Sequence, residues 1–166
     1  MKKMLNDQIG MEGYASSYYL SMASWCDTMG YEGAASFFYA QSDEERQHML
    51  KIVLHLNNIG AAVTIPAIKQ PPKDYKSLED MCKAALVNEQ AVTVAFARMA
   101  EYAQKEGDYS TFAFLQWYVN EQVQEETVLE TMLQKFDLVG RDKPALVEID
   151  RIIGSMVTKS NKADAA

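Results

Sequence analysis

The sequence predicts an all-α protein in which four long helices form a bundle and a shorter fifth helix follows. Glycine and proline interrupt helices and strands most strongly, and they fall in a few clusters that leave long stretches such as residues 73–106 free of both. These stretches are much longer than a typical strand. Apolar residues recur along each stretch at alternating spacings of three and four, the pattern of a helix face packed in a bundle. At 166 residues we expect one domain, residues 1–166.

The breakers also predict how the helices are connected. Gly30 separates the first two helices and Gly107 the third and fourth, and both connections are short, which indicates two antiparallel hairpins. The proline-containing link at 61–76 is long enough to cross the length of the bundle. Pro144 suits the first turn of the last helix. We expect helices at about 3–29, 32–59, 77–106, 109–136 and 144–157, and a frayed tail at 158–166.

The fifth helix has apolar residues with no obvious place in the core. Once four helices have packed together, no face of the bundle remains for them. We therefore expect these residues to be buried only when subunits assemble: Leu146, Ile149, Ile152 and Ile153.

Two glycines disturb the pattern of the first helix. Gly10 and Gly13 each cost about 1 kcal/mol relative to alanine inside a helix. They allow close approach of a neighbouring helix or a ligand beside Glu12, or they mark a weak first turn that the fold tolerates. The sequence favours neither interpretation over the other.

Composition narrows the class of partner. Sixteen Lys and Arg against 23 Asp and Glu give a net charge of −7, which argues against nucleic acids and anionic membranes and favours cations. No apolar run approaches the ~18 residues of a membrane span, and the first residues lack the apolar core of a signal peptide, so we expect a cytoplasmic protein.

Cys26 and Cys82 are too few for a disulfide scaffold, and we expect both to be reduced and buried.

Polar residues occupy inward positions near the middle of all four long helices. An uncompensated buried carboxylate costs several kcal/mol, and no Lys or Arg shares these positions. Such carboxylates must be protonated, hydrated or neutralised by a cation, and a metal ion is the simplest account. Glu45 and His48, three apart on one helix face, can offer an oxygen and a nitrogen to one ion. The whole set matches the arrangement of a di-iron or di-manganese site: Glu12, Glu45, His48, Glu89, Gln122 and Glu125.

Simpler interpretations remain for single residues. Taken alone, Glu12 or Glu89 is equally well explained by a hydrogen bond to a core tyrosine or to water. His55 lies one heptad beyond His48, and we interpret it as a core histidine rather than a ligand. Tyr19 lies one heptad beyond Glu12, and its spacing fits a structural hydrogen bond and a redox role equally well.

With these residues in place, the sequence resembles the ferritins, and specifically the bacterial non-haem type. The resemblance rests on Glu12, on Glu45-Arg46-Gln47-His48, on Glu89 and on the run FLQWYVNEQVQEE at 114–126, and it covers most of the chain. It implies a ferritin-like bundle in a homo-oligomeric, 24-subunit shell. It also implies that the shell oxidises Fe(II) with dioxygen or hydrogen peroxide and stores the Fe(III) product as a mineral.

The resemblance also implies roles for individual residues. Glu12, Glu45 and His48 would hold a first iron, and Glu45 would bridge to a second iron on Glu89 and Glu125. Gln122 and Tyr19 occupy the accompanying positions, which contact bound dioxygen or water and the electron-transfer path. A third iron site would fall on Glu44, Glu121, Gln124 and Glu125, where Gln124 replaces a carboxylate.

Departures from related families limit the alternatives. Arg46 stands where bacterioferritins carry a haem-ligating Met, so we expect no haem, and the fourth helix reads Gln122-x-x-Glu125 instead of a second Glu-x-x-His. The alternative function is a di-iron enzyme that detoxifies peroxide on the same bundle. Such an enzyme usually needs the second Glu-x-x-His and Cys-x-x-Cys pairs, and neither occurs here. The resemblance does not extend to an iron entry pore, because Phe112 and Leu115 are apolar.

Overall fold

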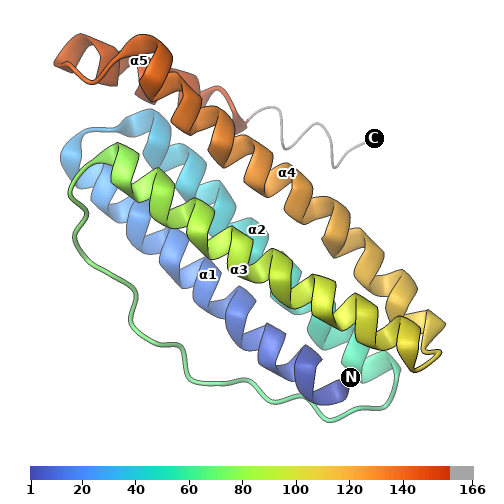
Figure 1. Ribbon diagram of the computed structural model, residues 1–166. Coiled ribbons are helices and arrows are strands. Elements are labelled where there is room, and N and C mark those ends of the chain that lie inside the picture. The colour runs from blue at the N-terminus through green and yellow to red at the C-terminus, as the bar shows by residue number, and fades with distance from the viewer. Residues whose placement is uncertain (158–166) are drawn as a thin grey trace.

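Four long helices lie side by side in a computed structural model of the chain, and a shorter fifth helix packs at one end of them (Figure 1). The structure describes residues 1–157, and no strand occurs among them. The predicted all-α bundle with a short C-terminal helix is therefore confirmed. Within this range no helix is long and apolar enough to cross a membrane. The helices are α1 (Lys2–Met29), α2 (Glu32–Asn58), α3 (Leu78–Lys105), α4 (Tyr109–Val139) and α5 (Lys143–Gly154).

The largest differences from the expected ranges are at the ends of the last two helices. The helix expected at 109–136 continues to Val139, because no breaker precedes Gly140. The helix expected at 144–157 ends at Gly154, and the expected frayed tail, 158–166, lies outside the described residues.

Local signals explain where the helices begin and end. The side chain of Ser77 accepts a hydrogen bond from the Asp80 backbone N–H, and Asp108 and Asp142 cap α4 and α5 in the same way. Gly30 ends α1 in the left-handed conformation at φ 82°, which glycine adopts without a steric penalty. Gly30 and Asp108 lie in the two hairpin connections, which are short and leave the helices of each hairpin side by side.

The predicted apolar ladders form the core, which is divided by a polar layer. One apolar cluster contains Tyr19, Met22, Cys26, Phe38, Leu129 and Phe136, and the other contains Leu5, Ile9, Ile52, Phe96 and Leu115. The polar inward residues of the four helices fall between the two clusters along every helix. The alternating spacing of three and four also predicted that His55 and Ile59 face inward at the end of α2, but His55 is only partly buried and Ile59 is exposed.

The link between α2 and α3 runs along the bundle beside α1 (Figure 1). A Cβ added at Gly13 would lie 2.9 Å from Ile68 Cδ1, and one added at Gly10 would lie 3.1 Å from Pro66 Cγ. The two glycines therefore admit this link, and Gly13 also admits a helix side chain, because its added Cβ would lie 3.3 Å from Met49 Sδ of α2.

The fifth helix corrects our expectation about its apolar face. Ile149 and Ile153 are fully buried within the single chain, in the same cluster as Tyr19, while Leu146 and Ile152 are partly buried. They are buried because α5 crosses α2 at two glycines, where a Cβ on Gly33 would lie 2.1 Å from the Asp150 carbonyl oxygen.

The Asp150 side chain links α5 to the start of α2 at this crossing. Its carboxylate accepts hydrogen bonds from the backbone N–H groups of Gly33 at 3.1 Å and Ala34 at 2.8 Å, so it satisfies donors at the start of α2. The helix N-terminus and the carboxylate also attract each other electrostatically.

Both cysteines are free and buried, as the composition suggested. Burial raises the pKa of the Cys26 and Cys82 thiols to about 12. Thiols with such pKa values are protonated and poorly reactive, which fits a role in packing.

Candidate metal centre

Glu12 of α1 and Glu45 and His48 of α2 come together in the polar layer, and we call these three residues the inner group. One ligand atom from each lies within 4.8 Å of the others. His48 Nδ1 is 3.5 Å from Glu45 Oε2 and 3.8 Å from Glu12 Oε2. The spacing of three between Glu45 and His48 puts both on one face of α2, opposite Glu12 on the neighbouring helix of the same hairpin.

Atoms of the inner group are buried without hydrogen-bond partners. Glu12 Oε2, Glu45 Oε1 and His48 Nδ1 all have none. Buried polar atoms are nearly always paired, so these atoms either share a proton, as the raised pKa values of the Glu12 and Glu45 carboxyls allow, or bind a cation.

Electrostatics point to the same conclusion. Burial raises the pKa of the Glu12 and Glu45 carboxyls well above their ordinary 4.5, and the negative charge of a neighbouring carboxylate, Glu45 for Glu12 and Glu89 for Glu45, raises each further. A bound cation would oppose both effects, because it attracts the ionised carboxylate form.

Glu89 of α3 is placed differently from the inner group. Tyr19 donates a hydrogen bond to its Oε1 at 2.5 Å, and the Gln122 amide donates to its Oε2 at 3.0 Å. Burial raises the pKa of Tyr19 well above its ordinary value, which keeps the phenol protonated as a donor. The core-tyrosine partner considered for Glu89 is therefore present, and the assignment of Glu89 and Gln122 to a second iron stays a prediction.

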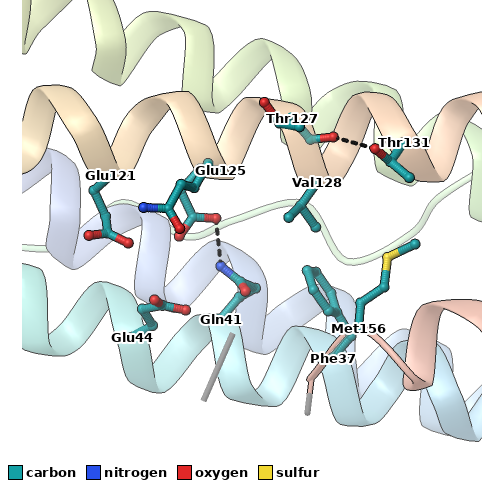
Figure 2. A pocket seen from close by; sticks show the side chains of 10 residues that line it. Phe37, Gln41, Glu44, Glu121, Glu125, Thr127, Val128, Thr131 and Met156 are labelled. Carbon is teal, nitrogen blue, oxygen red and sulfur yellow. Dashed lines mark hydrogen bonds between the residues drawn. The ribbon is translucent and has the colours of Figure 1, made fainter. Parts of the chain in front are cut away.

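A second acidic group lies between α2 and α4, and we call Glu44, Glu121 and Glu125 the outer group. One carboxylate oxygen from each lies within 4.8 Å of the others. They line one end of a cavity of about 260 Å³ whose other end is formed by Phe37, Val128 and Met156 (Figure 2). Burial, and then the charge of Glu44, raises the pKa of the Glu125 carboxyl.

The structure thus brings together part of the predicted set. Glu12, Glu45 and His48 form one group, and Glu44, Glu121 and Glu125 form the other. Glu125 was expected at both the second and the third iron, and it lies with the residues expected for the third, while its assignment to the second iron stays a prediction. Gln124, which replaces a carboxylate in the expected third site, is exposed and also lines the cavity.

Two further glutamines touch the carboxylates, and the sequence assigned neither a role. Gln8 donates from Nε2 to Glu12 Oε1 at 2.5 Å, and Gln41 donates from Nε2 to Glu125 Oε2 at 2.9 Å. Both lie on the predicted inward ladder and both are buried. Each glutamine lies four residues, about one helical turn, before a predicted ligand: Gln8 before Glu12 and Gln41 before Glu45. This spacing could have indicated a contact with the carboxylates.

His48 and His55 have different surroundings, and these indicate different roles. The Tyr118 hydroxyl donates to the His48 backbone oxygen at 2.7 Å, and the Trp117 ring meets the His48 ring edge-on at 5.3 Å. His55 instead stacks on Phe114 at 3.9 Å, and burial lowers its pKa. It joins neither metal-binding group among the described residues, in keeping with a packing role.

Comparisons with known proteins agree on one family. The family model of the ferritin-like domain matches residues 2–139. A probable bacterial non-heme ferritin-like protein from Haemophilus influenzae is 40% identical, over 95% of this chain and 96% of its own. The bacterial non-heme ferritin of Campylobacter jejuni is 37% identical, over 96% of both chains. The open pore ferritin from the archaeon Archaeoglobus fulgidus superposes with a TM-score of 0.90 at 35% identity, over 93% of this chain and 95% of that one.

Proposed function

Because the chain belongs to the ferritin family, we propose that it oxidises Fe(II) at the inner group and stores the Fe(III) product inside a closed shell of subunits. The observation that carries this proposal is the set of three buried, unpartnered ligand atoms on Glu12, Glu45 and His48. Fe(II) is the substrate of this site. Carboxylate and imidazole ligands suit iron in either oxidation state.

In the proposed oxidation, different residues of the polar layer bind different irons. The inner group binds the first Fe(II), and the carboxylates favour the higher charge of Fe(III) because the attraction grows with ionic charge. Glu45 bridges to a second iron position supplied by Glu89 and Glu125. Two adjacent irons pass two electrons together to dioxygen or hydrogen peroxide and so avoid one-electron products.

Tyr19 and Gln122 act on the second iron position through Glu89. Both side chains donate hydrogen bonds to its oxygens, one to each, and each oxygen keeps a lone pair that can bind a metal. The second position has no imidazole, so we expect it to bind iron more weakly than the first, which has His48. A weak second position suits a site through which iron passes to the mineral.

The outer group supplies a position for iron next to the reaction site. Glu125 belongs both to the proposed second iron position and to the outer group, so iron can be exchanged between them on one carboxylate. The cavity beside the outer group gives iron a place to leave the bundle. We propose that the outer group binds iron in transit rather than iron that stays.

Storage requires assembly. We propose a homo-oligomeric shell of 24 subunits, following the ferritin names of the relatives, with no nucleic-acid or membrane partner and with the cytoplasm as its compartment. The net charge of −7 on each chain would concentrate cations at such a shell.

Size and iron content test the proposed function together. The purified protein, freed of metal and then loaded with Fe(II) in air, should elute as one large particle that retains hundreds of iron atoms, on the order of the content that a mineral requires rather than one bound ion per site. A matched sample of the Glu45→Ala, His48→Ala double variant should assemble but load slowly. A small particle holding only stoichiometric iron would instead favour the peroxide-detoxifying alternative and would refute storage.

A further inference from the structure

Gln41 contacts Glu125, the carboxylate that the outer group shares with the proposed second iron position. Its amide nitrogen donates to Glu125 Oε2 at 2.9 Å, and Figure 2 shows this hydrogen bond reaching from α2 to α4. Gln41 is 4% exposed, and it lies three residues before Glu44 on the same helix. The amide therefore stands on the same face as the outer group.

The hydrogen bond limits where the Glu125 carboxylate points. One of its two oxygens is occupied by Gln41, and the side chain is thereby kept beside Glu44 and Glu121, where one oxygen completes the outer group. An amide can do this without cancelling the charge, because it carries none itself. A Lys or Arg in this place would neutralise the carboxylate and weaken its attraction for a metal.

The alternative position of Glu125 faces other acids. Gln41 lies one helical turn before Glu45 on α2, so the Glu125 carboxylate that it binds also lies on the side of α2 that carries the inner group. A Glu125 released from Gln41 is free to turn toward an inner cation when one is bound. The orientation of the Glu125 carboxylate therefore decides whether it contributes to the outer group or to the proposed second iron position.

We propose that Gln41 is a positioning residue that holds Glu125 in the outer group and so sets how metal divides between the outer and inner positions. This inference rests on the proposed function, because it requires both groups to bind metal.

The chain supplies its own matched control at the inner group. Gln8 donates to Glu12 Oε1 at 2.5 Å and is 1% exposed, so it forms the same amide-to-carboxylate pair with the same burial. Its carboxylate belongs only to the inner group. Removing the Gln8 amide should therefore affect the inner position and spare the outer one.

The test compares Gln41→Met with Gln8→Met, since methionine keeps the length of the side chain and removes the donor. Zn(II), which is not oxidised, is titrated calorimetrically into the metal-free assembled protein, and crystals soaked in Zn(II) assign each binding step by anomalous scattering. Loss of an outer-shell partner commonly weakens metal binding by about 10- to 100-fold. We expect Gln41→Met to weaken the outer position by about tenfold and the inner position by less than about twofold.

The Gln8→Met variant should show the reverse pattern. An outer affinity that Gln41→Met leaves within about twofold, or an equal loss at both positions, would overturn the role of Gln41. If Gln41→Met fails to assemble, Gln41→Leu is tested in the same way, and the metal-free crystal structure should show Glu125 turned away from Glu44 and Glu121. Zn(II) bound at neither group in the wild-type protein would instead refute the metal sites of the proposed function.

Discussion

The inner and outer groups are made of similar side chains, yet they meet water in different ways. The inner group is at most 3% exposed and has three atoms without hydrogen-bond partners, and its His48 reaches the wall of a cavity, whereas all three residues of the outer group line a cavity and Glu44 is half-buried. Glu44 and Glu45 are neighbours in the sequence and go to different groups, because one residue turns a helix by about 100°. One step along α2 thus separates a carboxylate suited to a reaction site from one suited to ion exchange.

Neutralising Glu45 and Glu44 separately should give the largest difference in the rate of Fe(II) oxidation between the two groups. Glu45→Gln removes a charged ligand from the inner group, and we expect rapid Fe(II) oxidation to fall by at least about 100-fold. Glu44→Gln removes one from the outer group, and the first phase of oxidation should change by less than about threefold. Stopped-flow absorbance after mixing with a few Fe(II) per subunit measures both variants.

Equal losses in the two variants would show that the groups are not functionally distinct. Thermal melts of both metal-free proteins serve as the control for folding. Wild-type oxidation in Glu45→Gln would remove the inner group from the reaction altogether.

The second prediction concerns the pH dependence of the metal-free protein. The pKa values of Glu12 and Glu45 are raised above 4.5 in the folded state, so the folded chain holds these protons more tightly than the unfolded chain does. Their contribution to stability is therefore present at low pH and is lost as pH rises from about 4.5 through the raised folded pKa values. We expect the melting temperature to fall by about 5 °C or more between about pH 5 and pH 8.

Glu45→Gln should flatten this dependence, because the amide does not ionise, while Glu44→Gln should retain most of it. Differential scanning calorimetry on chelator-treated samples provides the measurement. A melting temperature that rises over this range in the wild-type protein would contradict the raised pKa values of Glu12 and Glu45. Added Zn(II) should remove the fall in either case, since it favours the ionised carboxylates.

The smallest expected effect comes from restoring a charge beside the outer group. Gln124 lines the cavity but is exposed, so Gln124→Glu should strengthen Zn(II) binding there by only about threefold, because solvent screens exposed charges. Val123→Glu, at an exposed position on the same helix away from the cavity, is the matched control. Calorimetric titration should find the gain in Gln124→Glu alone, and a change at the inner group would show that the two groups are coupled.

Much of this architecture could be predicted from the sequence because helices obey a simple period. The apolar ladder of α1, from Leu5 to Cys26, is entirely buried, and the carboxylates on that ladder and its neighbours fall in one layer. The convergence of Glu12, Glu45 and His48 followed from the same register. Periodicity fixes which residues face inward when every helix is long and uninterrupted.

Contacts set by close approach or by side-chain rotation could not be predicted in this way. The burial of Ile149 and Ile153 depends on the crossing of Gly33 and Gly154, which lie far apart in the sequence and carry no periodic signal. The hydrogen bonds of Tyr19 and Gln122 to Glu89, and of Gln41 to Glu125, depend on rotamers within the core. The sequence indicated which side chains meet, and the structure was needed to show which atoms pair.

The two hairpins contribute to the polar layer separately, and this has a consequence for the order of folding. Glu12, Glu45 and His48 come from the α1–α2 hairpin, whereas Glu89, Gln122 and Glu125 come from the α3–α4 hairpin. Each hairpin has a short turn and can form from contacts that are local in the sequence. The acids lose water, and the acids of one hairpin meet those of the other, only when the hairpins dock after the long link of residues 59–77 has brought them together. Their repulsion therefore falls on a late step, so we expect cations to speed docking more than they speed hairpin formation.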